Sequence, residues 1–110
     1  MTEIRKLPEC EEMVMMVVWS AKDAPDLQET MENVNKTYAK TWTPQTVSTF
    51  LTRLRKKGFL TAYKKGRYTY YVPEVSWQEY RQMVIGRLVR NLYAGDSAEL
   101  LEDLMQIMEN

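Results

Sequence analysis

The sequence predicts a mainly α-helical fold with one small β-hairpin. Most of its 110 residues lie in segments where apolar side chains recur every three or four positions, as on one face of a helix. One stretch in the middle alternates with a period of two and is rich in aromatic and β-branched residues. The length suits one domain, or one domain with an added assembly element.

The N-terminal part predicts two helices. The first covers residues 8–20, which begin with proline and acidic residues, as a helix N-terminus prefers. Its apolar face contains Val14, Val17 and Val18, with Met15 and Trp19 beside them. A second start signal, Asp23 with Pro25, precedes a further helical pattern. The apolar positions of that pattern are Leu27, Met31 and Val34.

The third helix, expected over residues 43–57, is the most strongly marked. Thr43 before Pro44 is a favourable N-cap, because proline at the first helical position gives up no hydrogen bond. Lysines in the last turn suit the helix dipole, and Gly58 can end the helix. The apolar stripe consists of Val47, Phe50, Leu51 and Leu54.

After this helix the period changes from 3.6 to 2. Residues 59–64 and 67–72 predict two strands, and Lys65-Gly66 between them permits a tight turn. Lys-Gly is a weaker turn signal than Asn-Gly, so a loop longer than two residues stays open. Pro73 is expected to end the second strand. Two strands alone are marginal in water, so the hairpin must pack against the helices.

Two more helices follow the hairpin. Ser76 and Glu79 form a capping box for a helix that runs to about Tyr93. Gly95 breaks it, and Asp96 or the next residue starts the last helix. Three helices followed by a basic hairpin describe a winged helix, a variant of the helix-turn-helix.

The predicted domains are a winged helix-turn-helix domain at residues 1–74 and a helical dimerisation region at residues 75–110. Two short amphipathic helices beyond a complete winged-helix core need a surface to bury against. Packing on their own domain is one possibility, but a second copy is favoured because symmetric dimers are the commonest assembly. The candidate dimerisation residues are Tyr80, Val84, Leu88, Leu92, Leu100, Leu101, Leu104, Ile107 and Met108.

Charge is sorted along the chain although the formal net charge is zero. Residues 36–72 contain nine basic and no acidic side chains, whereas residues 1–35 and 73–110 are both net negative. A block of one sign creates a local positive field that the total charge conceals. The middle of the chain is therefore expected to face a negatively charged partner.

Several classes of protein are excluded by composition. Cys10 is the single cysteine and histidine is absent, so neither an internal disulfide nor a zinc site is expected. The longest apolar run, Met13 to Trp19, is shorter than the ~20 residues that span a bilayer. No histidine base, metal cluster or Gly-rich phosphate loop is present. We expect a cytoplasmic protein that is not an enzyme and uses no cofactor or metal.

The exposed face of the third helix is the candidate DNA-binding surface. It lacks acids and presents an amide, short hydroxyls and cations, which pair with base edges and phosphates. Backbone N–H groups at the helix N-terminus also favour phosphate. Together with the hairpin, the candidate DNA-binding residues are Thr43, Gln45, Thr46, Ser48, Thr49, Thr52, Arg53, Lys56, Lys64, Lys65, Arg67 and Tyr68.

Alternative interpretations account for parts of this pattern. A solvated helix face, with strand lysines that discourage edge pairing, explains some of the charge but not the lack of balancing acids over residues 36–72. A winged helix that docks on an acidic protein would suit the charge equally well. A protein-docking face should be richer in exposed aromatic and aliphatic residues than this one.

Two segments carry a resemblance to a known family. "WTPQTVSTFLTRLRKKGFL", followed by "YKKGRYTYY", resembles the bacterial penicillinase-repressor family, the BlaI/MecI/CopY type of winged-helix regulators. "ECEEMVMMVVW" is similar to that family's first helix. The resemblance implies a homodimeric repressor that binds double-stranded DNA at an inverted-repeat operator. Its recognition helix would be residues 43–57 and its wing residues 59–72.

The chain departs from the family in its regulatory features. A membrane sensor protease in this family cleaves an Asn-Phe bond, but Asn33, Asn35 and Asn91 are each followed by another residue and Asn110 is last. The copper-responsive branch uses a C-terminal cysteine cluster, and this chain has only Cys10. The resemblance thus supports DNA binding but neither signal input, and a sensor protease is a doubtful partner.

Overall fold

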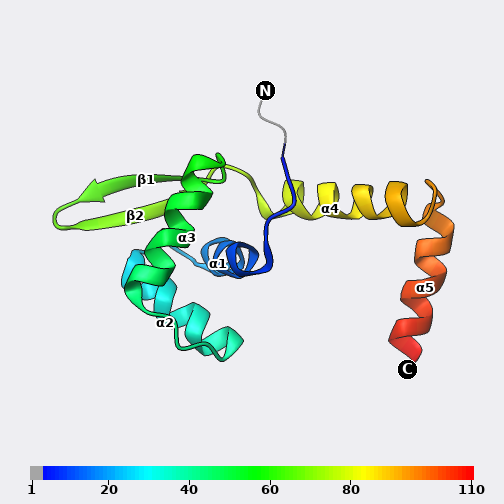
Figure 1. Cartoon of the computed structure of the whole chain (residues 1–110), viewed down its shortest axis with the longest axis horizontal. Coiled ribbons are helices and arrows are strands. Elements are labelled where there is room, and N and C mark those ends of the chain that lie inside the picture. Colours follow the sequence, from blue (N-terminus) through cyan, green and yellow to red (C-terminus); the bar gives the residue numbers. More distant parts are fainter. Residues whose placement is uncertain (1–3) are drawn as a thin grey trace. The chain divides into compact units, whose positions relative to one another are not determined.

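The structure, a computed structural model, describes residues 4–110. Five helices and two strands follow one another within them (Figure 1). In order they are α1 (Glu9–Ser20), α2 (Leu27–Tyr38), α3 (Pro44–Lys56), β1 (Leu60–Lys65), β2 (Tyr68–Pro73), α4 (Trp77–Leu92) and α5 (Ser97–Glu109). This order confirms the predicted mainly helical fold with one hairpin. The chain divides into two compact units, Met1–Trp77 and Gln78–Asn110.

The first unit is built on a core shared by α1, α2, α3 and the base of the hairpin. Its buried apolar side chains are Leu7, Val14, Met15, Val17, Val18, Val34, Val47, Leu51, Leu54, Phe59 and Leu60. Two long-range hydrogen bonds attach the hairpin region to the helices. The Tyr71 amide donates to the Pro25 carbonyl (3.0 Å), and the Trp19 indole N–H donates to the Val75 carbonyl (2.9 Å).

The start of α2 differs from the prediction. Asp26, not Asp23, is the N-cap, and its carboxylate accepts a hydrogen bond from the Glu29 amide (2.8 Å). Asp26 directly precedes the first helical residue, and from this position a side chain can accept hydrogen bonds from the free backbone amides of the first turn. Pro25 is buried, and its carbonyl is the acceptor for the hairpin amide.

The third helix forms as predicted, with one exception on its apolar stripe. Thr43 caps α3 by accepting a hydrogen bond from the Thr46 amide (3.2 Å), and Pro44 is the first helical residue. Gly58 after the helix has a φ of +82°, a left-handed conformation that glycine adopts without strain. Phe50, however, is only half-buried, because it lies at the margin of the stripe.

The hairpin turn lies one residue later than predicted. Lys65 is the last residue of β1 and pairs with Tyr68, so Gly66 and Arg67 form a two-residue loop. Gly66 has a φ of +67°, and Arg67 is not among the residues with positive φ. Glycine at the first loop position with a positive φ is the requirement of a type II′ turn, whose twist matches that of the strands. Pro73 ends β2 as expected.

The second unit contains most of α4 and all of α5. Gly95 has a φ of +83°, and the Asp96 carboxylate caps α5 by accepting from the Ala98 and Glu99 amides (3.0 and 3.4 Å). The Tyr93 hydroxyl donates to Asp103 (2.7 Å). This hydrogen bond raises the pKa of Tyr93 above its ordinary value. It joins the end of α4 to α5.

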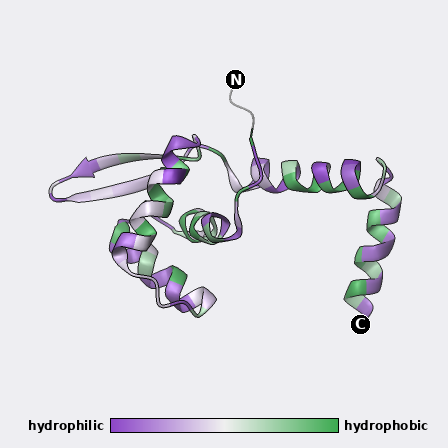
Figure 2. Ribbon diagram, in the orientation of Figure 1, coloured by the Kyte–Doolittle hydropathy of each residue, from purple (hydrophilic) through white to green (hydrophobic). Residues whose placement is uncertain are grey.

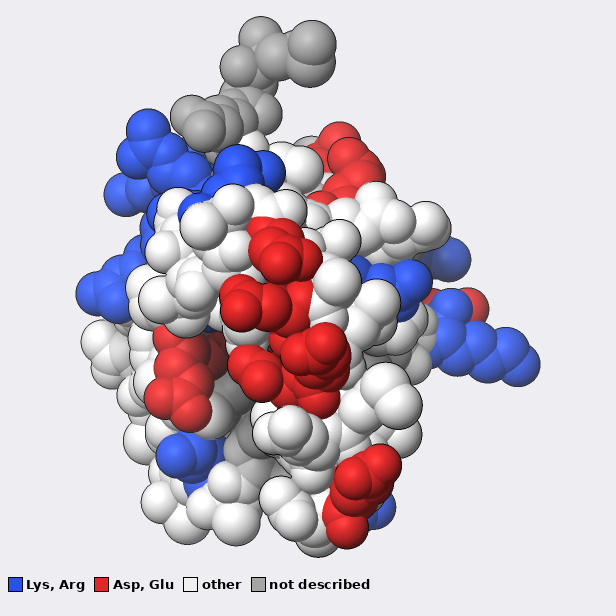
Figure 3. Space-filling model, turned by 90° about the vertical axis from the view of Figure 1, so that its right-hand side faces the viewer, with Lys and Arg blue, Asp and Glu red and all other residues white. Residues whose placement is uncertain are grey.

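Apolar residues along both C-terminal helices face solvent. Figure 2 shows hydrophobic positions running along α4 and α5. Among the large apolar residues of α5, the greatest exposures are 62% for Met105, 68% for Ile107 and 84% for Met108. Carboxylates gather on the face that α5 presents in Figure 3. None of the helices in residues 4–110 has the length and hydropathy of a membrane span.

We expect Leu51→Ala to lower the free energy of unfolding by about 2–5 kcal/mol, because it leaves a cavity between α3 and the core. Leu51 is fully buried. Urea unfolding followed by circular dichroism measures the loss. Asn33→Ala on the exposed side of α2 is the matched control and should change stability by less than about 0.5 kcal/mol. Equal effects of both substitutions would contradict this account of the core.

Candidate nucleic-acid interface

The outer face of α3 forms a shallow groove lined by residues that the sequence predicted. Burial of Val47, Leu51 and Leu54 fixes which side of the helix faces out. The opposite side carries no acid. Its groove is lined by Gln45, Ser48, Thr49, Thr52, Arg53 and Lys56. The structure therefore places six of the twelve candidate DNA-binding residues side by side.

The threonine hydroxyls in this groove have their protons engaged within the helix. Thr49 Oγ1 donates to the Gln45 carbonyl (3.0 Å), and Thr52 Oγ1 donates to the Ser48 carbonyl (2.9 Å). Each hydroxyl keeps acceptor lone pairs, and each side chain also carries a methyl group. Thr49 and Thr52 are thus suited to accept a hydrogen bond from a base or to contact a thymine methyl.

The N-terminus of α3 offers less to a phosphate than the sequence suggested. Pro44 has no N–H, and the Thr46 amide donates to Thr43. The Val47 amide donates to the Thr43 carbonyl (3.1 Å). The hydroxyls of Thr43 and Thr46 are also hydrogen-bonded to each other (3.0 Å). The cap therefore satisfies most of the amides that a phosphate would use, and Thr43 and Thr46 act first as structural residues.

The predicted wing residues are exposed around the hairpin turn. Figure 1 shows the hairpin extending beyond α3 to this turn. Lys64, Lys65, Arg67 and Tyr68 are all exposed. Arg67 and Tyr68 also line a shallow pocket with the first residues of α2, including Gln28. The wing cations thus lie apart from the α3 groove, on a second projecting surface.

Tyr63 and Tyr70 form a cross-strand pair on one face of the wing. Their ring centroids are 5.5 Å apart, and the rings are stacked with an interplanar angle of 28°. Such pairs stabilise a two-stranded ribbon that few other contacts support. Tyr70 therefore has a packing role in the wing.

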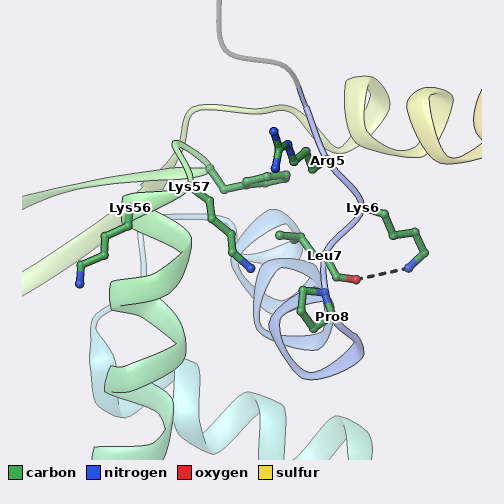
Figure 4. Close-up of a pocket in the computed structure, with 7 residues that line it drawn as sticks. Arg5, Lys6, Leu7, Pro8, Lys56 and Lys57 are labelled. Atoms are coloured by element: carbon green, nitrogen blue, oxygen red, sulfur yellow. Dashed lines mark hydrogen bonds between the residues drawn. The ribbon is translucent and has the colours of Figure 1, made fainter.

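Two cations near the end of α3 were missed in the sequence. Arg55 is exposed and lines a pocket with Thr52, Lys56 and the first residues of β1. The face predicted for the third helix did not include Arg55, and the structure places it beside the start of β1. Arg5, in the segment before α1, lies beside the end of α3. It lines a pocket together with Lys56, Lys57 and Phe59 (Figure 4).

Lys57 has a different role from Lys56. Its side chain points toward α1, where it forms an ion pair with Glu11, whereas Lys56 points away (Figure 4). The Glu11 side chain is 4% exposed and that of Lys57 is 42% exposed. The pair joins α1 to the end of α3 across the first unit. It holds the C-terminal end of the groove in place, and no local sequence pattern marks it.

The candidate dimerisation residues divide into two groups. Tyr80 is 4% exposed within the single chain, so its side chain is not part of an open surface. Half-exposed positions are Val84, Leu88 and Leu100, and exposed positions are Leu92, Leu101, Leu104, Ile107 and Met108. Trp77, Ile85 and Met105 are exposed as well, although the sequence did not single them out.

Comparisons with known proteins point to one family. The family model described as "Penicillinase repressor" matches residues 7–109. The penicillinase repressor of Bacillus licheniformis is 30% identical over an alignment 123 residues long. The alignment covers 99% of this chain and 94% of that protein.

Solved structures agree with this similarity. The DNA-binding domain of the repressor BlaI matches with a TM-score of 0.60. Bacillus licheniformis BlaI in its monomeric form, in complex with the blaP half-operator, matches with a TM-score of 0.58. Each is 35% identical and covers 73% of this chain and 94% of its own. The complex structure of hsRosR-S1 shares the fold alone, with a TM-score of 0.62, 13% identity, and coverage of 94% of this chain and 92% of that one.

We expect the two partners of the buried ion pair to differ in their effect on stability. Lys57→Met leaves the Glu11 carboxylate buried without its cation and should cost about 1–3 kcal/mol. Glu11→Gln leaves Lys57, which can turn into water, and should cost less. Chemical unfolding of both variants measures the difference. A larger loss of stability for Glu11→Gln than for Lys57→Met would contradict the view that the buried Glu11 carboxylate needs its partner more than Lys57 does.

Proposed function

The chain belongs to the penicillinase repressor family, and on this premise we propose that it represses transcription as a homodimer bound to an inverted-repeat operator. Membership makes it a DNA-binding repressor; the family is not one of enzymes. The observation that carries the finer proposal is the acid-free groove of α3, which gathers hydrogen-bonding groups and cations on one exposed helix face. A repressor works where the DNA is, so we place it in the cytoplasm.

The groove and the wing are assigned different tasks. In a winged helix, the recognition helix enters the major groove, whose base edges carry a unique pattern of donors and acceptors. Gln45, Ser48, Thr49 and Arg53 have the side chains for that pattern. Contacts to phosphate fix register and orientation without carrying sequence information. We assign them to Lys56 and to the cations Lys64, Lys65 and Arg67 of the wing, with Tyr68 as a hydroxyl donor.

Pairing of two copies is assigned to the second unit. BlaI was solved as a monomeric form on a half-operator, so one copy of that protein engages half a site. Two copies of this chain would engage both halves of an inverted repeat, about 34 Å or a small multiple of it apart. The exposed apolar residues of α4 and α5, among them Leu101 and Leu104, would supply a surface for the contact between copies. Since no Asn-Phe bond occurs in the sequence, cleavage of such a bond is not part of the proposal.

Docking on an acidic protein is the second candidate, favoured only by the positive charge. Protein-docking surfaces are enriched in aromatic residues and depleted of lysine at their centres. The α3 groove contains no aliphatic or aromatic side chain among its lining residues. The chemistry of the groove therefore favours DNA.

Selection from randomised duplex DNA at two salt concentrations, followed by sequencing, tests the proposal. Recovery of a palindromic motif is the expected result. Salt-sensitive binding without any motif would contradict sequence-specific repression. An absence of binding even at low salt would contradict DNA binding and favour an acidic protein as the partner of the basic surface.

Substitutions in the groove and in the wing should separate base contacts from phosphate contacts. Arg53→Ala or Thr49→Ala should relax sequence preference by about 1–3 kcal/mol at single base pairs. Lys65→Ala or Arg67→Ala should weaken binding to all duplexes alike and reduce the log–log salt slope by about 0.9 per lost contact. Equilibrium titrations at several salt concentrations measure both effects. A change of sequence preference in the wing variants would overturn this division.

A charge placed on the apolar face of α5 should separate the two copies. Leu104→Glu introduces a carboxylate at a position that is 44% exposed in the single chain. We expect a shift from dimer to monomer in sedimentation experiments, with weaker binding to the whole motif and unchanged binding to half of it. Gln106→Glu adds the same charge on the other side of α5 and should leave the dimer intact. Dimers that persist in Leu104→Glu would place the interface elsewhere.

A further inference from the structure

Phe50 is the apolar residue of α3 that the core does not bury. The fully buried positions of the stripe are Val47, Leu51 and Leu54, whereas Phe50 is half-buried beside them. A smaller side chain would expose less apolar surface at this position, so filling the core does not account for a phenyl ring. The contacts of the ring explain its presence better.

The ring of Phe50 connects the guanidinium of Arg53 to a fixed turn. The Arg53 guanidinium carbon lies 5.9 Å from the Phe50 ring centroid, within the range of about 6 Å for an attractive cation–ring contact. The Phe50 ring also packs against the Trp42 ring, with centroids 5.1 Å apart and an interplanar angle of 50°. Phe50 thus lies between a tryptophan in the turn and an arginine in the groove.

The turn that carries Trp42 is itself held by α2. The Asn35 side chain donates through Nδ2 to the Trp42 carbonyl and accepts at Oδ1 from the Trp42 amide, both at 3.0 Å. This double hydrogen bond fixes the Trp42 backbone relative to α2. A continuous series of contacts therefore runs from Asn35 through the two rings to Arg53.

Arg53 has its guanidinium donors free for a ligand. No acidic side chain within residues 4–110 forms an ion pair with it, and it is exposed along the groove. A free arginine samples many rotamers, and ordering them on binding lowers affinity. A guanidinium already held over a ring loses less freedom and presents its planar fork in one orientation.

We propose that Phe50 is a positioning residue that holds Arg53 for reading one base pair, and that Trp42, fixed by Asn35, holds Phe50 in turn. The inference rests on the proposed DNA binding and adds a determinant of specificity outside the groove-lining residues. Arg53 would pair with a guanine through two hydrogen bonds, a contact whose value depends on the orientation of the fork. Phe50 itself need not touch DNA.

The test compares Phe50→Leu with Phe50→Tyr in the full chain. Leucine keeps an apolar side chain but removes the ring, whereas tyrosine keeps the ring. Affinities are measured for the selected motif, for its single-base variants and for an unrelated duplex. We expect Phe50→Leu to lose about tenfold in discrimination at one base pair while binding the unrelated duplex within twofold of the original chain. Phe50→Tyr should retain the discrimination.

A double-mutant cycle with Arg53→Lys shows whether Phe50 acts through Arg53. Lysine keeps the charge but lacks the planar fork, so Arg53→Lys should lose discrimination at the same base pair. Phe50→Leu combined with Arg53→Lys should lose no more than Arg53→Lys alone. A merely destabilised fold would weaken all duplexes alike and leave the ratio unchanged.

Three results would overturn the inference. These are unchanged discrimination in Phe50→Leu, unchanged discrimination in Arg53→Lys, and additive losses in the double variant. A chain that shows no discrimination before any substitution would contradict the proposed function as well, so the two failures are distinguishable.

Discussion

Burial of one stripe of α3 is the constraint on which the rest of the structure depends. Val47, Leu51 and Leu54 are fully buried, and their burial leaves a single orientation of the helix about its axis. The Thr43 cap and the Lys57–Glu11 ion pair then hold its two ends. A helix fixed in this way presents the same polar face at all times. DNA recognition needs such rigidity, because misplaced hydrogen-bonding groups lose both affinity and discrimination.

Separation of charge along the sequence becomes separation of tasks in the fold. The acid-free residues 36–72 supply α3 and most of the hairpin, and acids are concentrated before and after them. In the second unit, carboxylates flank exposed apolar residues on α5. Such a unit repels the DNA backbone, and its exposed apolar surface suits the proposed pairing of two copies. Zero net charge is thus compatible with binding a polyanion.

Local patterns in the sequence account for the elements and the groove, whereas long-range contacts had to come from the structure. Helical periodicity and the Thr43-Pro44 start signal predicted α3 and the side chains that line its groove. Phe50 fits the same period, so its half-exposed position could not be distinguished from the core. Glu11 and Lys57 are separated by 46 residues, and no local signal joins them. Tyr80 likewise fits the apolar stripe that was expected to pair two copies, but it is buried within the single chain.

A residue-resolved NMR titration of the isotope-labelled chain with its selected duplex tests the central claim most directly. If the face of α3 opposite the buried stripe meets DNA, the largest shift changes will fall on residues 43–57 and around the hairpin turn. The chemical shifts of the α5 backbone amides will remain unchanged. Shift changes confined to α1 and α5, with α3 and the wing unaffected, would contradict the account.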